Sequence, residues 1–247
     1  MPDAGHALAL AAPRGLAVSR PVQLHIRRTG RWADYRVEVR EGASVLEALE
    51  EAWRLDHSLL FRHSCHHGSC GTCGMRINGR EALACLTPVA QAARGGRPVR
   101  LEPLRNFPLL GDLLVETQQV AAGIEAVGLP IVRDADRPDG HPAEGSPPEQ
   151  YENCIECGLC VSACPVVGSD RQFTGPAVLA AGGRVAEERR APDGLAAMTQ
   201  VSGEHGVWRC HGAFECSEVC PAEVDPAALI LGLRGGVFRR WMAGGRK

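Results

Sequence analysis

The chain has 247 residues, of which 45% are apolar and 23% are charged, and its formal net charge is −2. These values are typical of a globular protein, and a near-neutral charge argues against nucleic acid as a partner. No apolar run approaches the roughly 18 residues that a membrane-spanning helix needs. Residues 1–20 lack the basic start of a signal peptide, so we expect a flexible N-terminal tail there.

The first predicted elements are two strands and a helix. Apolar and polar residues alternate in 21–28 and again in 34–40, with turn-like residues between them, which predicts a hairpin. Ser44 and Glu47 form a capping-box pattern that predicts a helix running through Trp53.

A cysteine-rich loop follows this helix, and residues 97–102 then predict one more strand. The loop has C-x4-C-x2-C spacing with a fourth cysteine twelve residues later, which is typical of plant-type 2Fe–2S sites. Its interleaved glycines allow the backbone to approach a cluster closely. A zinc knuckle or buried free thiols are the alternatives, although zinc sites usually pair two short arms. The four candidate ligands are Cys65, Cys70, Cys73 and Cys85.

The remainder of the chain predicts mostly helices, with a domain boundary near residue 106. We expect a helix that begins at Gly111–Asp112 and presents Leu114, Val115, Val120 and Ile124 on one face. Residues 133–150 predict a surface loop.

Two further helices are expected near the C-terminus. One follows Gly175–Pro176 and runs through Arg190, before the break at Pro192. The other begins at Asp225–Pro226 and runs to Gly235–Gly236. The residues after it, 237–242, are expected to be either an interface segment or a frayed end.

Residues 154–165 have the pattern C-x2-C-x2-C-x3-C-P, which in bacterial ferredoxins serves two clusters. The first three cysteines of such a run bind one cluster and the fourth binds the other. Residues 210–221 repeat the pattern, except that Ala213 replaces the second cysteine. The predicted 4Fe–4S ligands are Cys154, Cys157, Cys160 and Cys220, and the predicted ligands of the second cluster are Cys164, Cys210 and Cys216.

Alanine cannot bind iron, so the second cluster is expected to be 3Fe–4S. The alternative is a 4Fe–4S cluster whose fourth iron binds water or an outside ligand such as His211. The sequence has no dinucleotide or phosphate-binding motif. Three clusters without substrate machinery indicate an electron carrier.

The whole pattern resembles the iron–sulfur subunit of succinate dehydrogenase/fumarate reductase. The resemblance covers roughly residues 21–235 and includes the segments between the cysteines: residues 106–108, 173–177, 206–210, 216–221 and 224–228. The last of these segments are more similar in sequence to the fumarate reductase branch of the family than to the classical succinate dehydrogenases. Many succinate dehydrogenases have a quinone-binding tryptophan a few residues after the first C-P, whereas residues 166–170 contain none. Fumarate reductases often lack it too.

The resemblance implies an α+β fold: a β-grasp ferredoxin domain over 21–106 and a mainly helical ferredoxin-like domain over 107–247. It also implies a flavoprotein partner with FAD, membrane anchor subunits, and a quinone near the 3Fe–4S cluster, with His211 and Pro165 in its vicinity. The chain would then lie at the cytoplasmic face of the inner membrane, held there by its partners.

The main alternative is a soluble electron-transfer subunit of another flavin oxidoreductase, such as a thiol-dependent fumarate reductase or a glycolate or glycerol-phosphate dehydrogenase. Those proteins typically contain the four-cysteine run twice in full, so Ala213 argues against them.

Overall fold

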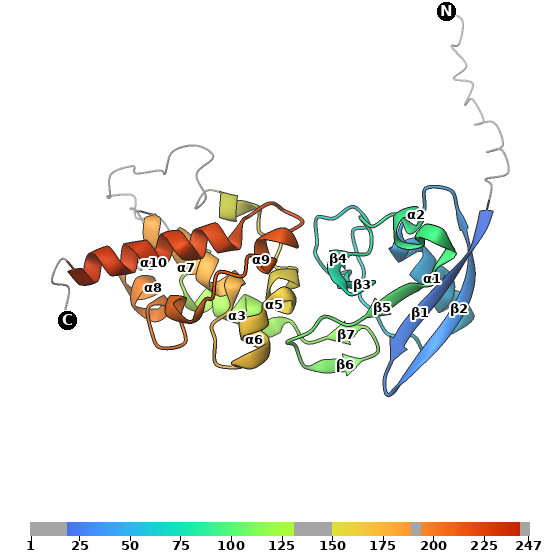
Figure 1. Ribbon diagram of the computed structural model, residues 1–247, viewed down its shortest axis with the longest axis horizontal. Coiled ribbons are helices and arrows are strands. Elements are labelled where there is room, and N and C mark those ends of the chain that lie inside the picture. The colour runs from blue at the N-terminus through green and yellow to red at the C-terminus, as the bar shows by residue number, and fades with distance from the viewer. Residues whose placement is uncertain (1–18, 131–149, 189–193, 243–247) are drawn as a thin grey trace, which may run out of the picture.

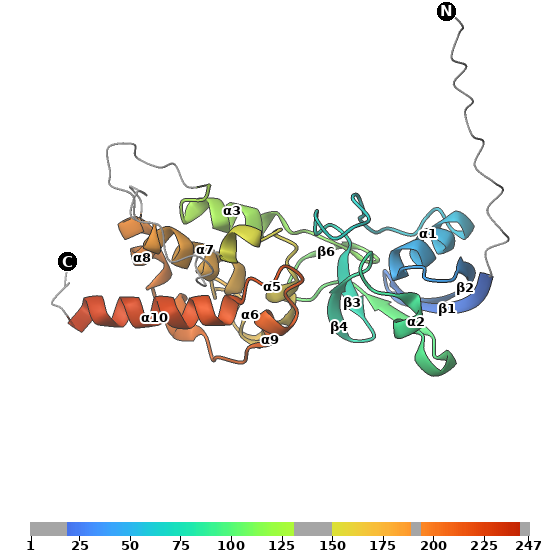
Figure 2. The same ribbon diagram turned by 90° about the horizontal axis from the view of Figure 1, so that it is seen from above.

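The structure is a computed structural model that describes residues 19–130, 150–188 and 194–242. It is elongated, with a β-sheet at one end and a group of helices at the other (Figures 1 and 2). The α+β class expected from the sequence is confirmed. The expected loop 133–150, apart from Gln150, and most of the expected N-terminal tail lie outside the described residues, while Ser19 and Arg20 begin the first strand.

The N-terminal half is a five-stranded sheet of order β2-β1-β5-β3-β4 that packs on one helix. β1 pairs antiparallel with β2 and parallel with β5, and β3 pairs antiparallel with both β4 and β5. The elements are β1 (Ser19–Arg28), β2 (Arg31–Arg40), α1 (Val45–Leu55), β3 (Gly74–Ile77), β4 (Arg80–Leu83), α2 (Val89–Ala92), a 3-10 turn (Arg94–Gly96) and β5 (Val99–Glu102).

The predicted hairpin, helix and final strand of this half are all present. The capping box of α1 is formed in full, since the Ser44 hydroxyl accepts from the Glu47 N–H while the Glu47 carboxylate accepts from the Ser44 N–H. Leu24 of β1 and Leu46 and Leu49 of α1 have no exposed surface. Apolar burial between sheet and helix therefore holds this half together.

A short hairpin and a helical half follow, and here one prediction was wrong. Leu114 and Val115 form a strand, whereas the helix starts only at Gln118. The Asp112 carboxylate accepts hydrogen bonds from the N–H groups of Thr29 and Leu60, which hold this segment against the sheet as a hairpin. The elements are β6 (Leu109–Gly111), β7 (Leu114–Val115), α3 (Gln118–Ala126), 3-10 turns (Tyr151–Asn153 and Val207–Arg209), α5 (Leu159–Ala163), α6 (Pro165–Ser169), α7 (Pro176–Glu187), α8 (Gly194–Val201), α9 (Glu215–Glu218) and α10 (Pro226–Met242).

The central helix of this half is α7, which is buried over most of its length and packs against α3, α8 and α10. The predicted start of α10 is correct, because the Asp225 carboxylate accepts from the Ala228 N–H at 3.2 Å. The predicted end is wrong, since the helix continues through Gly235 and Gly236 to Met242. Residues 237–242 are therefore helical.

Side chains from both halves meet at a buried junction beside the cysteines. The Ser162 hydroxyl of α5 donates to the Glu81 carboxylate of β4 at 2.9 Å and accepts from the Arg105 N–H at 2.9 Å. Arg105 also pairs with Glu81 at 3.1 Å. Since both Ser162 and Glu81 are buried, this junction fixes α5, which carries Cys160, against the sheet.

Candidate iron–sulfur sites

All eleven cysteines are free thiols. They fall into three groups, of which one lies on and beside a single loop and the other two line two hollows. The first group lies on the loop between α1 and β3 and just after β4. The Sγ atoms of Cys73 and Cys85 are 3.3 Å apart. Cys65 and Cys70 are joined by a contact of 3.5 Å between the Cys65 N–H and the Cys70 sulfur.

Hydrogen-bond donors of the first loop point at its sulfur atoms. The His67 N–H donates to the Cys65 sulfur at 3.5 Å, and the Thr72 hydroxyl lies 3.1 Å from the Cys70 sulfur. The donor from His67, followed by those of neighbouring side chains, lowers the pKa of Cys65 to about 5. Burial instead raises the pKa of Cys73 to about 12. The loop thus provides both an accessible thiolate and a buried thiol.

The second group combines cysteines from two distant segments. Cys154, Cys157, Cys160 and Cys220 line one hollow at the start of α5. Burial raises the pKa of Cys157 to about 11, and the adjacent charges of Cys154 and Cys220 raise it further. Burial also raises the pKa of Cys160 well above its usual value. The Val224 N–H donates to the Cys220 sulfur at 3.4 Å.

The third group lines a neighbouring hollow with Cys164, Cys210 and Cys216. Burial raises the pKa of Cys216 to about 11, and the charges of Cys164 and Cys210 add to this shift. Ala213, His211 and Pro165 line the same hollow, and all three are exposed. The segments from 154–164 and 210–220 therefore exchange one cysteine each, which is the arrangement that the sequence pattern predicts.

These donor sets fit iron–sulfur clusters. Four sulfurs around one tetrahedral zinc ion lie roughly 3.8 Å apart, given Zn–S bonds of about 2.3 Å. Among the described residues, no three cysteine sulfurs lie within 4.8 Å of one another. Buried thiols with raised pKa values become thiolates when iron replaces their protons. The spacing and the chemistry of the thiols therefore suit a group larger than a single ion.

The first and second groups approach each other at Gly71. This glycine has φ of +70°, and a Cβ atom built on it would lie 2.8 Å from the Cys157 Cβ and 2.9 Å from the Ile155 carbonyl oxygen. Only glycine fits such a contact. The sequence indicated that glycines bring this loop close to a cluster, but it did not reveal that Gly71 brings one cysteine loop against another.

Comparison with known proteins agrees with this geometry. Residues 16–122 match a family described as a 2Fe-2S iron-sulfur cluster binding domain, and residues 150–224 match a 4Fe-4S dicluster domain. A fumarate reductase iron-sulfur subunit from Mycobacterium tuberculosis is 40% identical, with 79% of this chain and 81% of the relative covered. The chain belongs to the fumarate reductase/succinate dehydrogenase iron–sulfur subunit family.

Two further relatives and one solved structure have lower sequence identity to this chain. A fumarate reductase iron-sulfur subunit from Escherichia coli is 37% identical over 80% of this chain and 82% of its own. A succinate dehydrogenase iron-sulfur subunit from Coxiella burnetii is 29% identical over 85% and 92%. Among solved structures, the Mycobacterium smegmatis Sdh1 complex contains a chain with a TM-score of 0.74 and 27% identity, covering 90% of this chain and 98% of that one. This chain is thus an iron–sulfur electron-transfer subunit of the family.

Within residues 19–130, 150–188 and 194–242, no helix combines the length and apolar character needed to cross a membrane.

Proposed function

We propose that this chain carries electrons between an FAD-containing flavoprotein subunit and a quinone site formed with membrane anchor subunits. Its three thiol groups would hold, in order, a 2Fe–2S, a 4Fe–4S and a 3Fe–4S cluster, each of which exchanges one electron at a time. The observation that carries the proposal is the row of three adjacent thiol groups, the last of which contains Ala213 in place of a ligand.

The order of the groups is supported by contacts between them. The first loop meets the second group at Gly71 and Cys157. The second group meets the third at Cys160, whose pKa is raised mainly by burial and also by nearby sulfurs that include Cys216. Short separations of this kind suit electron transfer along the row. We propose residues 21–106 and 107–247 as the two domains that hold it.

The ligand assignment follows the same groups. Cys65, Cys70, Cys73 and Cys85 would bind the 2Fe–2S cluster. Cys154, Cys157, Cys160 and Cys220 would bind the 4Fe–4S cluster, and Cys164, Cys210 and Cys216 the 3Fe–4S cluster. The N–H donors at His67 and Val224 would stabilise the negative charge on the sulfurs that they contact.

The third group supports a quinone site at its outer edge. His211 and Pro165 are exposed and line the hollow that contains the three thiols, so a ligand from outside can reach them. The His211 imidazole would form a hydrogen bond with a quinone oxygen. Several large apolar side chains are exposed in the same half of the chain, as a partner surface requires: Trp208, Phe214, Leu231, Phe238 and Met242.

We infer that the chain serves the fumarate reductase branch at the cytoplasmic face of the inner membrane. The higher identity to fumarate reductase subunits than to the succinate dehydrogenase subunit supports the branch.

Substitution of Ala213 tests the cluster assignment. Anaerobically purified chain should show the signal of an oxidised 3Fe–4S cluster in electron paramagnetic resonance. Ala213→Cys supplies a fourth thiolate, so it should remove this signal and lower the reduction potential of the centre. Ala213→Val introduces no ligand at the same exposed position and should keep the signal.

Two results would contradict this assignment: no such signal in the unaltered chain, or an unchanged signal in Ala213→Cys. The first would also argue against the proposed function itself.

A further inference from the structure

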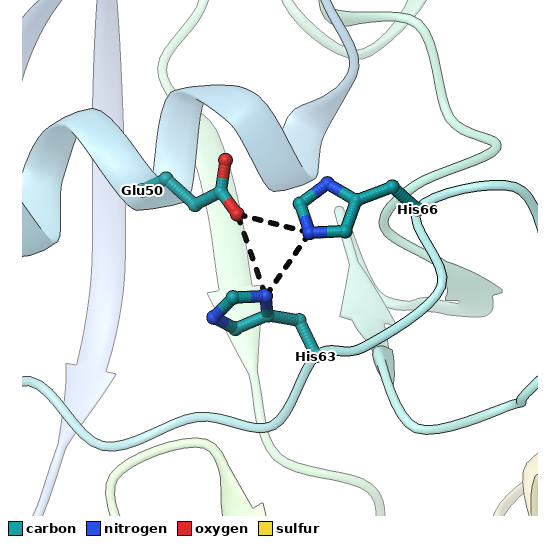
Figure 3. A group of neighbouring side chains, drawn as sticks. All are labelled: Glu50, His63 and His66. Carbon is teal, nitrogen blue, oxygen red and sulfur yellow. Dashed lines mark hydrogen bonds and ion pairs between the residues drawn. The ribbon is translucent and has the colours of Figure 1, made fainter.

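Three metal-binding side chains converge at a place that the thiol groups do not use. Glu50 extends from α1, while His63 and His66 come from the loop that leads through Cys65 (Figure 3). Figure 3 shows the carboxylate and the two imidazole rings pointing toward one another. None of the three belongs to the proposed cluster ligands.

The three ligand atoms form a nearly equilateral triangle. The Glu50 Oε1 atom is 3.4 Å from His63 Nδ1 and 3.3 Å from His66 Nε2, and the two nitrogens are 3.2 Å apart. A carboxylate only accepts hydrogen bonds, and each of these nitrogens either donates or accepts one. Hydrogen bonds can therefore form along at most two of the three sides of the triangle. A single cation above its centre, in contrast, is bound by all three atoms.

The side lengths identify the class of cation. A tetrahedral ion with bonds of about 2.0–2.1 Å, as for Zn²⁺, places its ligand atoms roughly 3.3–3.4 Å apart. Octahedral Mg²⁺ at the same bond length requires roughly 2.9 Å between adjacent ligands, and both Mg²⁺ and Ca²⁺ prefer oxygen. Imidazole suits zinc and the later transition metals. The observed 3.2–3.4 Å thus matches a tetrahedral transition-metal ion.

Surrounding groups hold the ligands in place. His66 has a left-handed backbone with φ of +63°, which is unusual for a residue with a side chain. The His63 ring stacks on Phe61 with centroids 5.2 Å apart. Glu50 is fixed on a regular helix, and its side chain is only 23% exposed.

The group is also accessible. The side chains of His63 and His66 are 40% and 44% exposed, and a hollow lined by Trp53, His57 and Glu50 opens beside them. Three protein ligands with an open fourth position are typical of zinc sites that keep a bound water.

We propose that Glu50, His63 and His66 bind one divalent transition-metal ion of the zinc type, with water as the fourth ligand. The ion connects α1 to the loop that carries Cys65 and so braces this loop from outside.

Zinc binding to the cluster-loaded chain tests the proposal. Chain washed with a chelator should take up one zinc per chain in equilibrium dialysis, with its iron content unchanged. Glu50→Gln and His63→Gln should bind zinc at least about tenfold more weakly, because each removes a ligand. Glu50→Gln lies outside the loop, so it leaves cluster loading intact.

Two control variants match these changes. Glu51→Gln alters the neighbouring carboxylate of the same helix, which pairs with Arg54, and His25→Gln removes an imidazole on β1. Both should bind zinc as the unaltered chain does. Equal zinc affinity of Glu50→Gln and the unaltered chain, or no uptake by the unaltered chain, would overturn the proposal.

X-ray absorption at the zinc edge identifies the ligands directly. Nitrogen and oxygen neighbours at about 2.0–2.1 Å are expected, without a sulfur shell. Sulfur at about 2.3 Å would show that zinc occupies the thiols instead, and would also overturn the proposal. Neither failure would affect the proposed electron-transfer function, which is tested by the paramagnetic signal of the Ala213 variants.

Discussion

At the scale of single residues, Gly71 occupies a position with almost no freedom. It brings the loop of Cys70 and Cys73 into van der Waals contact with the backbone around Cys157. Its left-handed φ is unfavourable for any other residue, and the space for a side chain is already filled. Both the backbone conformation and the lack of space for a side chain therefore require glycine at this position.

Comparison of Gly71→Ala with Gly79→Ala separates these demands. Gly79 also has a left-handed φ, of +89°, but a Cβ atom at that position would have no other atom within 4 Å. Both substitutions should destabilise the chain by about 1–2 kcal/mol because of the backbone conformation. Only Gly71→Ala should also push the two loops apart and slow electron transfer to quinone in the assembled complex.

Anaerobic unfolding and steady-state quinone turnover measure the two effects. Equal turnover for the two alanine variants would show that the contact at Gly71 does not limit transfer.

At the scale of elements, α5 depends on a side chain from outside its own helix. The Asn106 amide nitrogen lies 2.8–3.1 Å from three carbonyl oxygens at the end of α5, those of Val161, Ser162 and Cys164, which share its two N–H donors. A five-residue helix has few internal hydrogen bonds, so these contacts satisfy the carbonyls that its end exposes. Asn106 thereby positions the segment between Cys160 and Cys164.

Asn106→Asp should remove this support. Aspartate tolerates the left-handed backbone at this position, where φ is +67°, but its carboxylate would face three carbonyl oxygens. We expect a loss of about 1–3 kcal/mol in unfolding free energy and a weaker 3Fe–4S signal.

Asn78→Asp provides the control. Asn78 is also left-handed, and its amide donates to the Ala92 carbonyl at 2.8 Å, far along the chain from the second and third thiol groups. The Asn78→Asp variant should lose stability but keep the 3Fe–4S signal. A full signal in Asn106→Asp would contradict the role given to this side chain.

The elements also show which features a sequence pattern can predict. The hairpin, α1 and β5 follow from alternation and the capping box, because their patterns are local. The helix expected from Asp112 was wrong because the Asp112 carboxylate bonds instead to Thr29 and Leu60, which are distant in sequence. Packing of α10 along α7 offsets the low helix propensity of Gly235 and Gly236.

Candidate sites divide in the same way. The exchange of cysteines between the two runs could be predicted, because it follows from the spacing of the cysteines alone. The group of Glu50, His63 and His66 could not, since it depends on how α1 packs beside a loop that starts after its end. The contact between Gly71 and Cys157 likewise depends on how the two halves of the chain meet.

At the scale of the whole molecule, Asp112 joins three segments. Its carboxylate accepts from the N–H groups of Thr29 and Leu60 at 2.8 and 3.0 Å and pairs with the buried Arg28 guanidinium at 2.9 Å. Burial would raise the pKa of Asp112, but these donors together hold it below its usual value. The β6–β7 hairpin is thereby fixed to the sheet.

The depressed pKa makes this stabilisation depend on pH. The stabilisation by Asp112 is complete above the pKa that its carboxyl has in the unfolded chain, about 4. It is lost as the pH falls through the lower pKa that the carboxyl has in the folded chain. Asp112→Asn should be less stable than the unaltered chain by about 1–3 kcal/mol at pH 7, and the difference should narrow in acid. Urea unfolding at pH 7 and at pH 3 measures this difference.

Asp34→Asn changes an exposed carboxylate that pairs with His25, so it should leave stability nearly unchanged at pH 7. A constant difference between Asp112→Asn and the unaltered chain at both pH values would refute the assignment to Asp112.

The exchange of cysteines between the two C-terminal runs also affects how the protein is made. The first thiol group is complete once residue 85 has been synthesised, because its four cysteines lie within 21 residues of one another. The other two groups each contain thiols from both runs, so neither is complete until a ribosome has passed residue 216. A nascent chain therefore offers one finished thiol set early and two late, and the late ones become available almost together.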